Sequence, residues 1–213
     1  MSSPYIEVLL EGASDVPVLR QVLSAHFNLN EGEHFRLHPH HGKGRLPTNP
    51  RSRPELHHRG LLDQLPAKLR GFGKSLPPEA LVLVVVDVDE EDCRDLLARL
   101  RALLSAIEPR PRVLFRLAIE ETESWFLADA AAIASAFPTA RTKVFQGVTP
   151  DAVVGAWELL ARALERKIES VTGRDKYAWA EAIAPHLELA PAFSPSLERL
   201  LTGVSRYLEE VRS

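Results

Sequence analysis

The chain of 213 residues contains a single cysteine, Cys93, and has no apolar run close to the length that crosses a bilayer. With one cysteine no intramolecular disulfide can form, and a zinc cluster built on cysteines is excluded. A membrane-spanning helix needs about 20 apolar residues in succession. The first residues also lack the basic segment and apolar core of a signal peptide. We therefore expect a cytoplasmic protein that does not act at a membrane.

The chain also has no large excess of positive or negative charge, because 26 basic and 29 acidic residues leave a formal net charge of -3. A chain with this balance has no overall attraction for a polyanion. Binding of nucleic acid would need a local basic patch, or metal ions that offset the carboxylates. Hydrophobic residues make up 45% of the chain, which is enough for a substantial core.

The most hydrophobic segment runs from Ala80 to Asp89 and ends in two aspartates, Asp87 and Asp89. Its apolar residues do not alternate with polar ones, which is typical of a strand buried on both faces of a parallel sheet. Ligands of open α/β sheets lie outside the carboxyl ends of the strands. Residues two apart on a strand point to the same side, so the two carboxylates could converge on one point. Such a pair needs a cation or a shared proton, and it predicts a divalent-metal site, most plausibly for Mg²⁺.

Strand and helix patterns alternate along the first part of the chain and become helical afterwards. We expect strands at 5–10, 35–38, 81–87 and 112–119. We expect helices at 16–26, 60–71, 92–107, 123–137, 151–170, 176–187 and 196–212. This alternation indicates an α/β fold with a mainly parallel sheet flanked by helices. We divide the chain into an α/β core at 1–138 and a helical C-terminal extension at 139–213 packed on that core.

Acidic residues follow three of the expected strands, where the carboxyl ends of parallel strands share one edge of the sheet. Together they could bind two metal ions, an arrangement that serves in-line phosphoryl chemistry. Acids also favour helix N-termini, where they cap free N–H groups. Asp15 and Glu123 fit either role. Capping or solvation is the expected role of Glu90, Glu91, Asp92, Glu120 and Glu121.

Two short motifs carry a resemblance to a known family. Glu11-Gly12 after the first strand and Asp87-Val88-Asp89 after a later one resemble the Toprim domain of topoisomerases, primases and overcoming-lysogenization-defect nucleases. The stretch 8–19 resembles the version in those nucleases, in which a second acid, here Asp15, follows the glutamate. The segments 118–129, 176–185 and 194–201 are similar to an uncharacterised bacterial Toprim-like family, known mainly as a domain of unknown function. The resemblance spans most of the chain and implies a Toprim-like (Rossmann-like) fold.

The same resemblance implies roles for the acids. Mg²⁺ or Mn²⁺ would be the cofactor, Asp87 and Asp89 would hold the metal, and Glu11 would act as general acid or base. In the nuclease version a second metal would be held by Asp15 and Glu123.

Those nucleases also use a lysine near the scissile phosphate. Lys176 is the candidate for this role, and Lys143 is the competitor. The chain lacks the ATPase domain that is attached in the nuclease family, which implies an ATPase partner on a separate chain.

A loop with little apolar content occupies residues 39–59. His38 and His40 could contribute to a transition-metal site, but the prolines and glycines of the loop give no fixed geometry. A lid or a loop that contacts nucleic acid is the better hypothesis. The basic residues expected to contact phosphates are Lys43, Arg45, Arg51 and Arg53.

These features predict a Mg²⁺-dependent Toprim-like nuclease or phosphodiesterase acting on nucleic acid, in bacterial defence or DNA processing. The alternative is a non-catalytic subunit that binds nucleic acid or nucleotide and regulates a partner ATPase. Such a binding module would tolerate the loss of Glu11. A response-regulator-like receiver domain also has acids at strand ends, but the chain is too long after the sheet and the spacing of the acids does not match.

Overall fold

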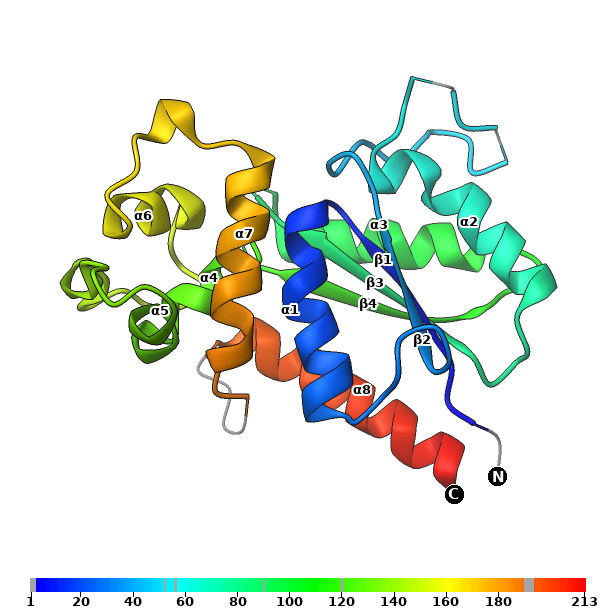
Figure 1. The fold of residues 1–213 in the computed structure, drawn as a ribbon. Coiled ribbons are helices and arrows are strands. Elements are labelled where there is room, and N and C mark those ends of the chain that lie inside the picture. The colour runs from blue at the N-terminus through cyan, green and yellow to red at the C-terminus, as the bar shows by residue number, and fades with distance from the viewer. Residues whose placement is uncertain (1–2, 52, 56, 90, 120, 190–193) are drawn as a thin grey trace.

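A parallel four-stranded sheet forms the centre of the molecule (Figure 1). The computed structural model describes residues 3–51, 53–55, 57–89, 91–119, 121–189 and 194–213. The strand order is β2-β1-β3-β4, and the predicted α/β fold is confirmed. The strands are β1 (Ile6–Leu10), β2 (Phe35–Pro39), β3 (Leu81–Asp87) and β4 (Arg112–Ala118).

The strand β3 lies between β1 and β4 and is buried up to its last residue. Its unbroken run of Val and Leu agrees with this position, because helices cover both faces of the sheet. Leu9 of β1 lies beside Val84, and Asp87 lies beside Ala118 of β4. All four strands are parallel, so their carboxyl ends open on one edge.

Helices on the two faces make a three-layer molecule. One face, which includes Leu9 and Val84, packs against α2 (Leu61–Ser75) and α3 (Cys93–Ser105). The opposite face, which includes Val8 and Leu83, packs against two helical units. These are α1 (Val16–Gln21), which continues as a π-helix at Val22–His26, and α8 (Pro195–Arg212).

The remaining helices gather beyond the carboxyl ends of the strands, at the left of Figure 1. They are α4 (Glu123–Leu127), α5 (Ala130–Ala136), α6 (Ala156–Ala163) and α7 (Gly173–Ile183). One hydrophobic cluster joins them to β1, α1, β3 and α8. The predicted boundary at residue 138 therefore crosses a shared core, and it stays a prediction. None of the described helices is long and apolar enough to span a membrane.

Two helix predictions in this part were wrong. The expected helix at 123–137 is two helices, because the Asp129 side chain accepts a hydrogen bond from the Ala132 N–H and starts α5 anew. The expected helix at 151–170 consists of α6 and a short 3-10 turn at Ile168–Ser170. Asp151 and Gly155 have positive φ angles of 62° and 74°, which an α-helix does not contain, so the helix can begin only at Ala156.

Candidate active site

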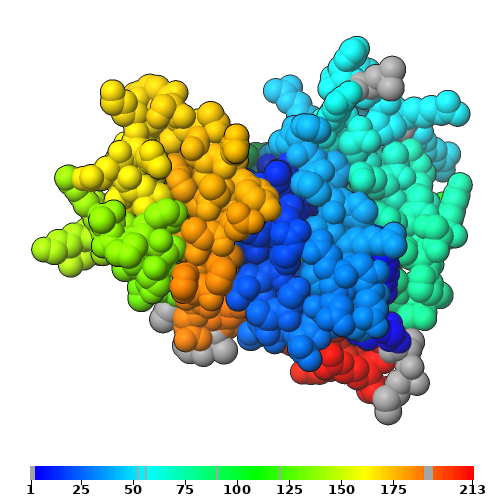
Figure 2. Space-filling model, in the orientation of Figure 1, coloured from blue at the N-terminus to red at the C-terminus, as the bar shows by residue number. Residues whose placement is uncertain are grey.

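Five acidic residues gather at the carboxyl ends of β1, β3 and β4, and we call them the acidic centre. Their side chains are close enough to perturb one another electrostatically. In the space-filling view the outline of the molecule is notched at this edge, between α7 and the residues that follow β2 (Figure 2). The members are Glu11, Asp15, Asp87, Glu121 and Glu123.

Hydrogen bonds connect the three strand ends. The Asp87 N–H donates to Glu11 Oε1 at 2.9 Å, which joins β3 to the turn after β1. Asp15 Oδ2 accepts from the Gly12 N–H at 2.9 Å within that turn. Asp15 Oδ1 accepts from the buried Thr122 hydroxyl at 2.8 Å, which joins the turn to the start of α4. Sequence reasoning missed Thr122, whose only signal is its place among the glutamates that follow β4.

Burial is the main cause of the raised pKa values of Glu11 and Asp15. Burial and repulsion from Asp15 and Asp89 raise the pKa of Glu11 to about 8. Burial and repulsion from Glu123 raise the pKa of Asp15 to about 6. Glu11 therefore carries a proton at neutral pH unless a cation offsets the charge around it.

The other two perturbed acids of the centre follow the same rule. Burial, with repulsion from Asp15 and Glu11, raises the pKa of Asp87 well above its usual range. Burial and repulsion from Glu123 raise the pKa of Glu121 to about 7. Both carboxyl groups therefore resist ionisation, although attraction to Lys176 partly offsets the rise in the pKa of Glu121.

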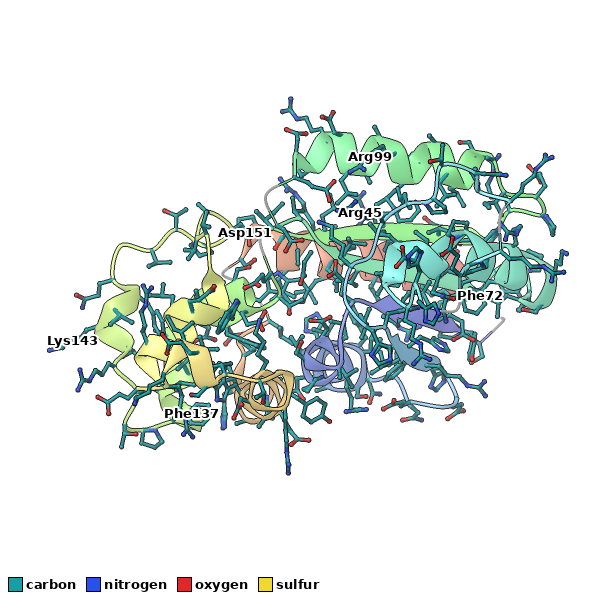
Figure 3. The ribbon with its side chains drawn as sticks, turned by 90° about the horizontal axis from the view of Figure 1, so that it is seen from above. Arg45, Phe72, Arg99, Phe137, Lys143 and Asp151 are labelled. Carbon is teal, nitrogen blue, oxygen red and sulfur yellow. The ribbon has the colours of Figure 1, made fainter. Side chains whose placement is uncertain are left out.

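Lys176 lies on the α7 side of the acidic centre, as its predicted role requires. Its Nζ is 3.7 Å from Glu123 Oε1 and 3.9 Å from Glu121 Oε1, and it lies 4.4 Å from the centre of the Trp157 ring. Lys143 is exposed and lies at the outer edge of the helical part, far from the sheet (Figure 3). The structure thus brings Lys176, and not Lys143, to the acids.

Contrary to the prediction from its sequence position, Asp89 does not point to the same side of a strand as Asp87. β3 ends at Asp87, and Asp89 has a φ of 52°, so the two residues do not share a strand face. Half of the Asp89 side chain is exposed, and its Oδ2 lies 2.9 Å from Lys43 Nζ. Lys43 also lies 2.9 Å from Glu91 Oε1. Both Asp89 and Lys43 remain close enough to Glu11 to influence its pKa, so they form the rim of the acidic centre.

The capping predictions have mixed outcomes. The Asp92 side chain accepts from the first N–H groups of α3, as predicted. Glu91 pairs with Lys43 and does not cap. Glu121 accepts from the Trp157 N–H at 3.2 Å, at the start of α6 and not of its own helix. Glu90 and Glu120 lie outside the described residues.

The loop after β2 is held at its start by the backbone. The Gly42 N–H donates to the Glu11 carbonyl oxygen at 2.9 Å, and the Leu62 N–H donates to the Lys43 carbonyl oxygen at 2.7 Å. Gly44 has a φ of 67° and packs against Gly60, where an added Cβ on Gly60 would lie 2.5 Å from Gly44 Cα. These contacts aim Lys43 at the acidic centre.

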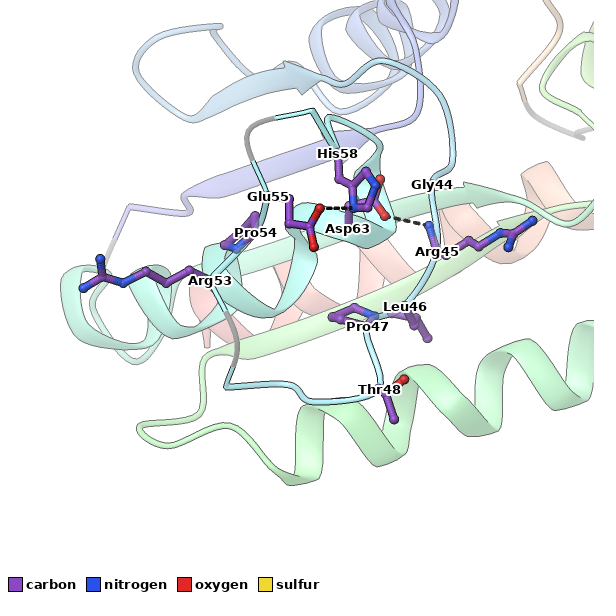
Figure 4. A pocket seen from close by; sticks show the side chains of 10 residues that line it. All are labelled: Gly44, Arg45, Leu46, Pro47, Thr48, Arg53, Pro54, Glu55, His58 and Asp63. Atoms are coloured by element: carbon purple, nitrogen blue, oxygen red, sulfur yellow. Dashed lines mark hydrogen bonds and ion pairs between the residues drawn. The ribbon is translucent and has the colours of Figure 1, made fainter.

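Farther along, the loop borders a cavity of about 590 Å³ (Figure 4). The Arg45 and Arg53 side chains point away from this cavity in opposite directions, whereas Glu55 and His58 point into it. Arg51 is exposed as well. The three arginines are exposed where a polyanion could reach them. Arg45 and Arg53 belong to the lining of this cavity, and Arg51 does not.

Asp151 is a second residue that sequence reasoning missed. It lies between the helical part and the sheet (Figure 3). Its Oδ2 accepts from the Ser196 N–H at 2.6 Å, and its Oδ1 accepts from the Ser194 and Ser196 hydroxyls, both at 2.9 Å. The Trp125 indole N–H, in α4, donates to the same Ser196 hydroxyl at 2.7 Å. This network ties α8 to the helix that carries Glu123.

The chemistry of the acidic centre fits a hard divalent cation. Its donors are carboxylate oxygens, which Mg²⁺ and Mn²⁺ prefer. A cation would offset the burial and mutual repulsion that raise the pKa values of these acids. Within the described ranges, no three acidic, His or Cys side chains converge tightly enough to enclose an ion as they stand. Binding would therefore need these side chains to turn toward one another.

Comparison with known proteins places the chain in a family. A family described as a domain of unknown function (DUF4276) matches residues 10–205. The chain belongs to the DUF4276 family. No curated protein matches this DUF4276 chain.

Solved structures agree on the fold of the DUF4276 chain. The C-terminal region of the Burkholderia pseudomallei OLD protein matches with a TM-score of 0.51 and 12% identity, over 98% of both chains. The C-terminal region of the Xanthomonas campestris pv. campestris OLD protein matches with a TM-score of 0.48 and 15% identity, over 100% of both chains. The first likeness shows that the chain shares the fold of the C-terminal region of that overcoming-lysogenization-defect (OLD) protein, in agreement with the predicted α/β fold.

Proposed function

We propose that this chain is a divalent-metal-dependent phosphodiesterase of the nuclease type, acting on nucleic acid with Mg²⁺ or Mn²⁺. The observation that carries the proposal is the acidic centre, where carboxyl groups from three parallel strand ends meet with raised pKa values. Structural pairing alone does not account for so many buried acids facing one another. The fold shared with OLD C-terminal regions supports the assignment.

Asp87, Asp15 and Glu123 would hold the metal, with Asp89 at the rim. A divalent cation there would polarise a phosphate oxygen and lower the pKa of a bound water. Thr122 orients Asp15 toward the centre through its 2.8 Å hydrogen bond. A hydrogen-bonded carboxylate of this kind loses less freedom when it becomes a ligand.

Glu11 suits proton transfer. In the metal-free protein burial raises the pKa of Glu11 to about 8, and a bound cation would lower that pKa toward neutral, where the carboxyl group can exchange a proton with a departing oxygen. Its Oε1 is held by the Asp87 N–H, which leaves Oε2 for the reacting atoms. Lys176, stacked on Trp157, brings a positive charge to the same edge and would stabilise charge on the phosphate. Arg45, Arg51 and Arg53 would contact the nucleic-acid backbone farther out.

The test is cleavage of end-labelled DNA and RNA by purified protein in Mg²⁺, in Mn²⁺ and in EDTA. Asp87→Asn and Glu11→Gln should each lower the metal-dependent cleavage rate by at least about 100-fold. This is the usual contribution of a group that transfers a proton or holds a metal to the rate. Asp95→Asn, an exposed acid on α3, is the matched control and should be unaffected. Circular dichroism checks that all three variants fold. Wild-type rates in both site variants would reject the proposal.

A second candidate is a non-catalytic subunit that binds nucleic acid or nucleotide and regulates a separate ATPase chain. Two observations favour it: Lys43 already pairs with Asp89 and Glu91 at the rim, and the Burkholderia pseudomallei OLD segment that shares this fold is the C-terminal region of its protein. It predicts binding without cleavage, and binding that survives Glu11→Gln.

A further inference from the structure

A second cleft, of about 540 Å³, opens beside the carboxyl end of β2 and the first half of α2. Four basic residues line it, and we call it the basic cleft. The acidic residue on its lining is Glu55, whose side chain is 75% exposed at the rim. The basic residues are His40, His41, Arg59 and Lys68.

Lys68 brings a partly buried positive charge to this cleft. Among the described residues its ammonium has neither a hydrogen bond nor an ion pair, and burial lowers the pKa of Lys68. Glu7 is the acid that attracts Lys68, and its carboxylate is already bound to other side chains. Glu7 accepts from the Tyr5 hydroxyl at 3.1 Å, and its Oε2 lies 2.5 Å from His38 Nε2. A half-buried charge without a direct hydrogen-bond or ion-pair partner is costly, and an anionic ligand would lower that cost.

His40 presents an unused hydrogen-bonding atom in the same place. Its Nδ1 lies 2.8 Å from the Leu10 carbonyl oxygen, which can only accept, so Nδ1 carries the proton. Its Nε2 is buried and has no partner within the described part of the chain. Burial, with repulsion from Lys68 and His38, lowers the pKa of His40. A hydrogen phosphate group could donate to this nitrogen, and the protonated ring could donate to a phosphate oxygen.

The basic cleft adjoins the acidic centre through two successive backbone contacts. The His40 N–H donates to the Leu10 carbonyl oxygen at 3.0 Å, and the Gly42 N–H donates to the Glu11 carbonyl oxygen at 2.9 Å. Only His41 separates His40 from Gly42 along the chain, so the Cα atoms of His40 and Gly42 are at most about 7 Å apart. A strand that has its scissile phosphate at Glu11 and runs toward the end of β2 would pass over the cleft.

We propose that the basic cleft binds a second phosphate group of the nucleic-acid substrate, next to the one at the acidic centre. This assignment rests on the proposed function and adds how the strand is positioned. Lys68 and Arg59 supply the charge. His40 Nε2 accepts from the hydroxyl of a hydrogen phosphate, or donates to a phosphodiester oxygen when the ring is protonated. The phosphate is either the terminal phosphate of a strand or a bridging phosphodiester. The first measurement below distinguishes these two sources.

The first measurement is fluorescence anisotropy of labelled oligonucleotides with a 5′-phosphate or a 5′-hydroxyl. Lys68→Met should weaken binding roughly tenfold, the effect of losing one charged hydrogen bond, and reduce the slope of log affinity against log salt by about 1. Lys74→Met, an exposed lysine six residues farther along α2, should change neither. A loss confined to the 5′-phosphate probe assigns a terminal phosphate, whereas an equal loss on both probes assigns a phosphodiester. Equal affinities and slopes for Lys68→Met and wild type would overturn the proposal.

The second measurement needs neither metal nor activity. Inorganic phosphate is titrated into the metal-free protein while the His40 ring nitrogens are followed by ¹⁵N NMR. Wild type should show a saturable shift that is lost in Lys68→Met and kept in Lys74→Met. A shift that never saturates, or that is the same in Lys68→Met, would contradict the cleft. If the protein cleaves nucleic acid but shows no phosphate-dependent shift, this inference is wrong and the proposed function stands. If the shift occurs but the protein does not cleave, the proposed function is wrong and the phosphate site stands.

Discussion

At the scale of single residues, the acidic centre depends on polar contacts that compensate for burial. Asp15 is 4% exposed and Thr122 is 1% exposed. Among the described residues, the Thr122 hydroxyl and the Gly12 N–H donate hydrogen bonds to the Asp15 carboxylate. The hydrogen bond from Thr122 favours the ionised form and lowers the pKa of Asp15 against the effect of burial. Residue 122 therefore controls the charge of a group that we propose to hold metal.

Thr122→Val keeps the shape of the side chain and removes the donor. We expect the pKa of Asp15 to rise further above about 6, and stability at neutral pH to fall by about 1–3 kcal/mol because a buried carboxylate loses its partner. Urea unfolding measures the stability, and ¹³C NMR of the carboxyl carbon measures the pKa. Thr202→Val, exposed on α8, is the control and should stay within about 0.5 kcal/mol. An unchanged pKa in Thr122→Val would show that the hydroxyl does not stabilise the carboxylate.

At the scale of elements, the start of α2 fixes the loop that carries Lys43. Gly60 is buried at the N-cap of α2, and its backbone touches that of Gly44. The close approach lets the Leu62 N–H reach the Lys43 carbonyl oxygen at 2.7 Å. The position of one helix start thereby sets the position of a lysine at the rim of the acidic centre.

Gly60→Ala and Gly71→Ala should have opposite effects, although both glycines belong to α2 or its cap. A Cβ on Gly60 would meet the Gly44 backbone at 2.5 Å, so the loop must shift, at a cost of about 1–3 kcal/mol. A Cβ on Gly71 meets nothing within 4 Å, so alanine should stabilise the helix by about 0.5–1 kcal/mol. Thermal unfolding of both variants measures the difference. Equal effects of the two changes would show that the contact between Gly44 and Gly60 is not tight.

At the scale of the whole molecule, the acidic centre makes stability depend on pH. The pKa of Glu11 is about 8 in the folded chain against an ordinary value of 4.5, and that of Glu121 is about 7. Below about pH 4.5 both the folded and the unfolded states carry these protons. At higher pH only the folded state keeps them, so the contribution of each group to stability is lost as the pH rises through its folded pKa.

In EDTA the free energy of unfolding should therefore decline from pH 6 to pH 9. Mg²⁺ should oppose the decline, because it binds ionised carboxylates in the folded state only. Differential scanning calorimetry at both pH values, with and without Mg²⁺, measures the effect. Glu11→Gln cannot ionise and should flatten the decline. Equal melting temperatures at pH 6 and pH 9 in EDTA would rule out the raised pKa values.

Much of the acidic centre was predictable, because charged residues directly after buried strands are not explained by core packing. Glu11, Asp15, Asp87 and Glu123 were expected from their places after strands, and the structure gathers all four. The pairing of Lys43 with Asp89 and the bond from Thr122 to Asp15 were not predictable. Each joins segments far apart along the chain, and no local pattern encodes such a contact.

Local sequence patterns were enough to predict the parallel α/β fold, because unbroken apolar strands alternating with amphipathic helices can be buried in few other ways. They also predicted which edge of the sheet carries the acids, since parallel strands end together. The strand order, the break within 123–137 and the placement of Asp89 off the strand face depend on long-range packing and became known from the three-dimensional fold. The basic cleft was likewise decided there, because it forms only where the end of β2, the following loop and α2 pack together.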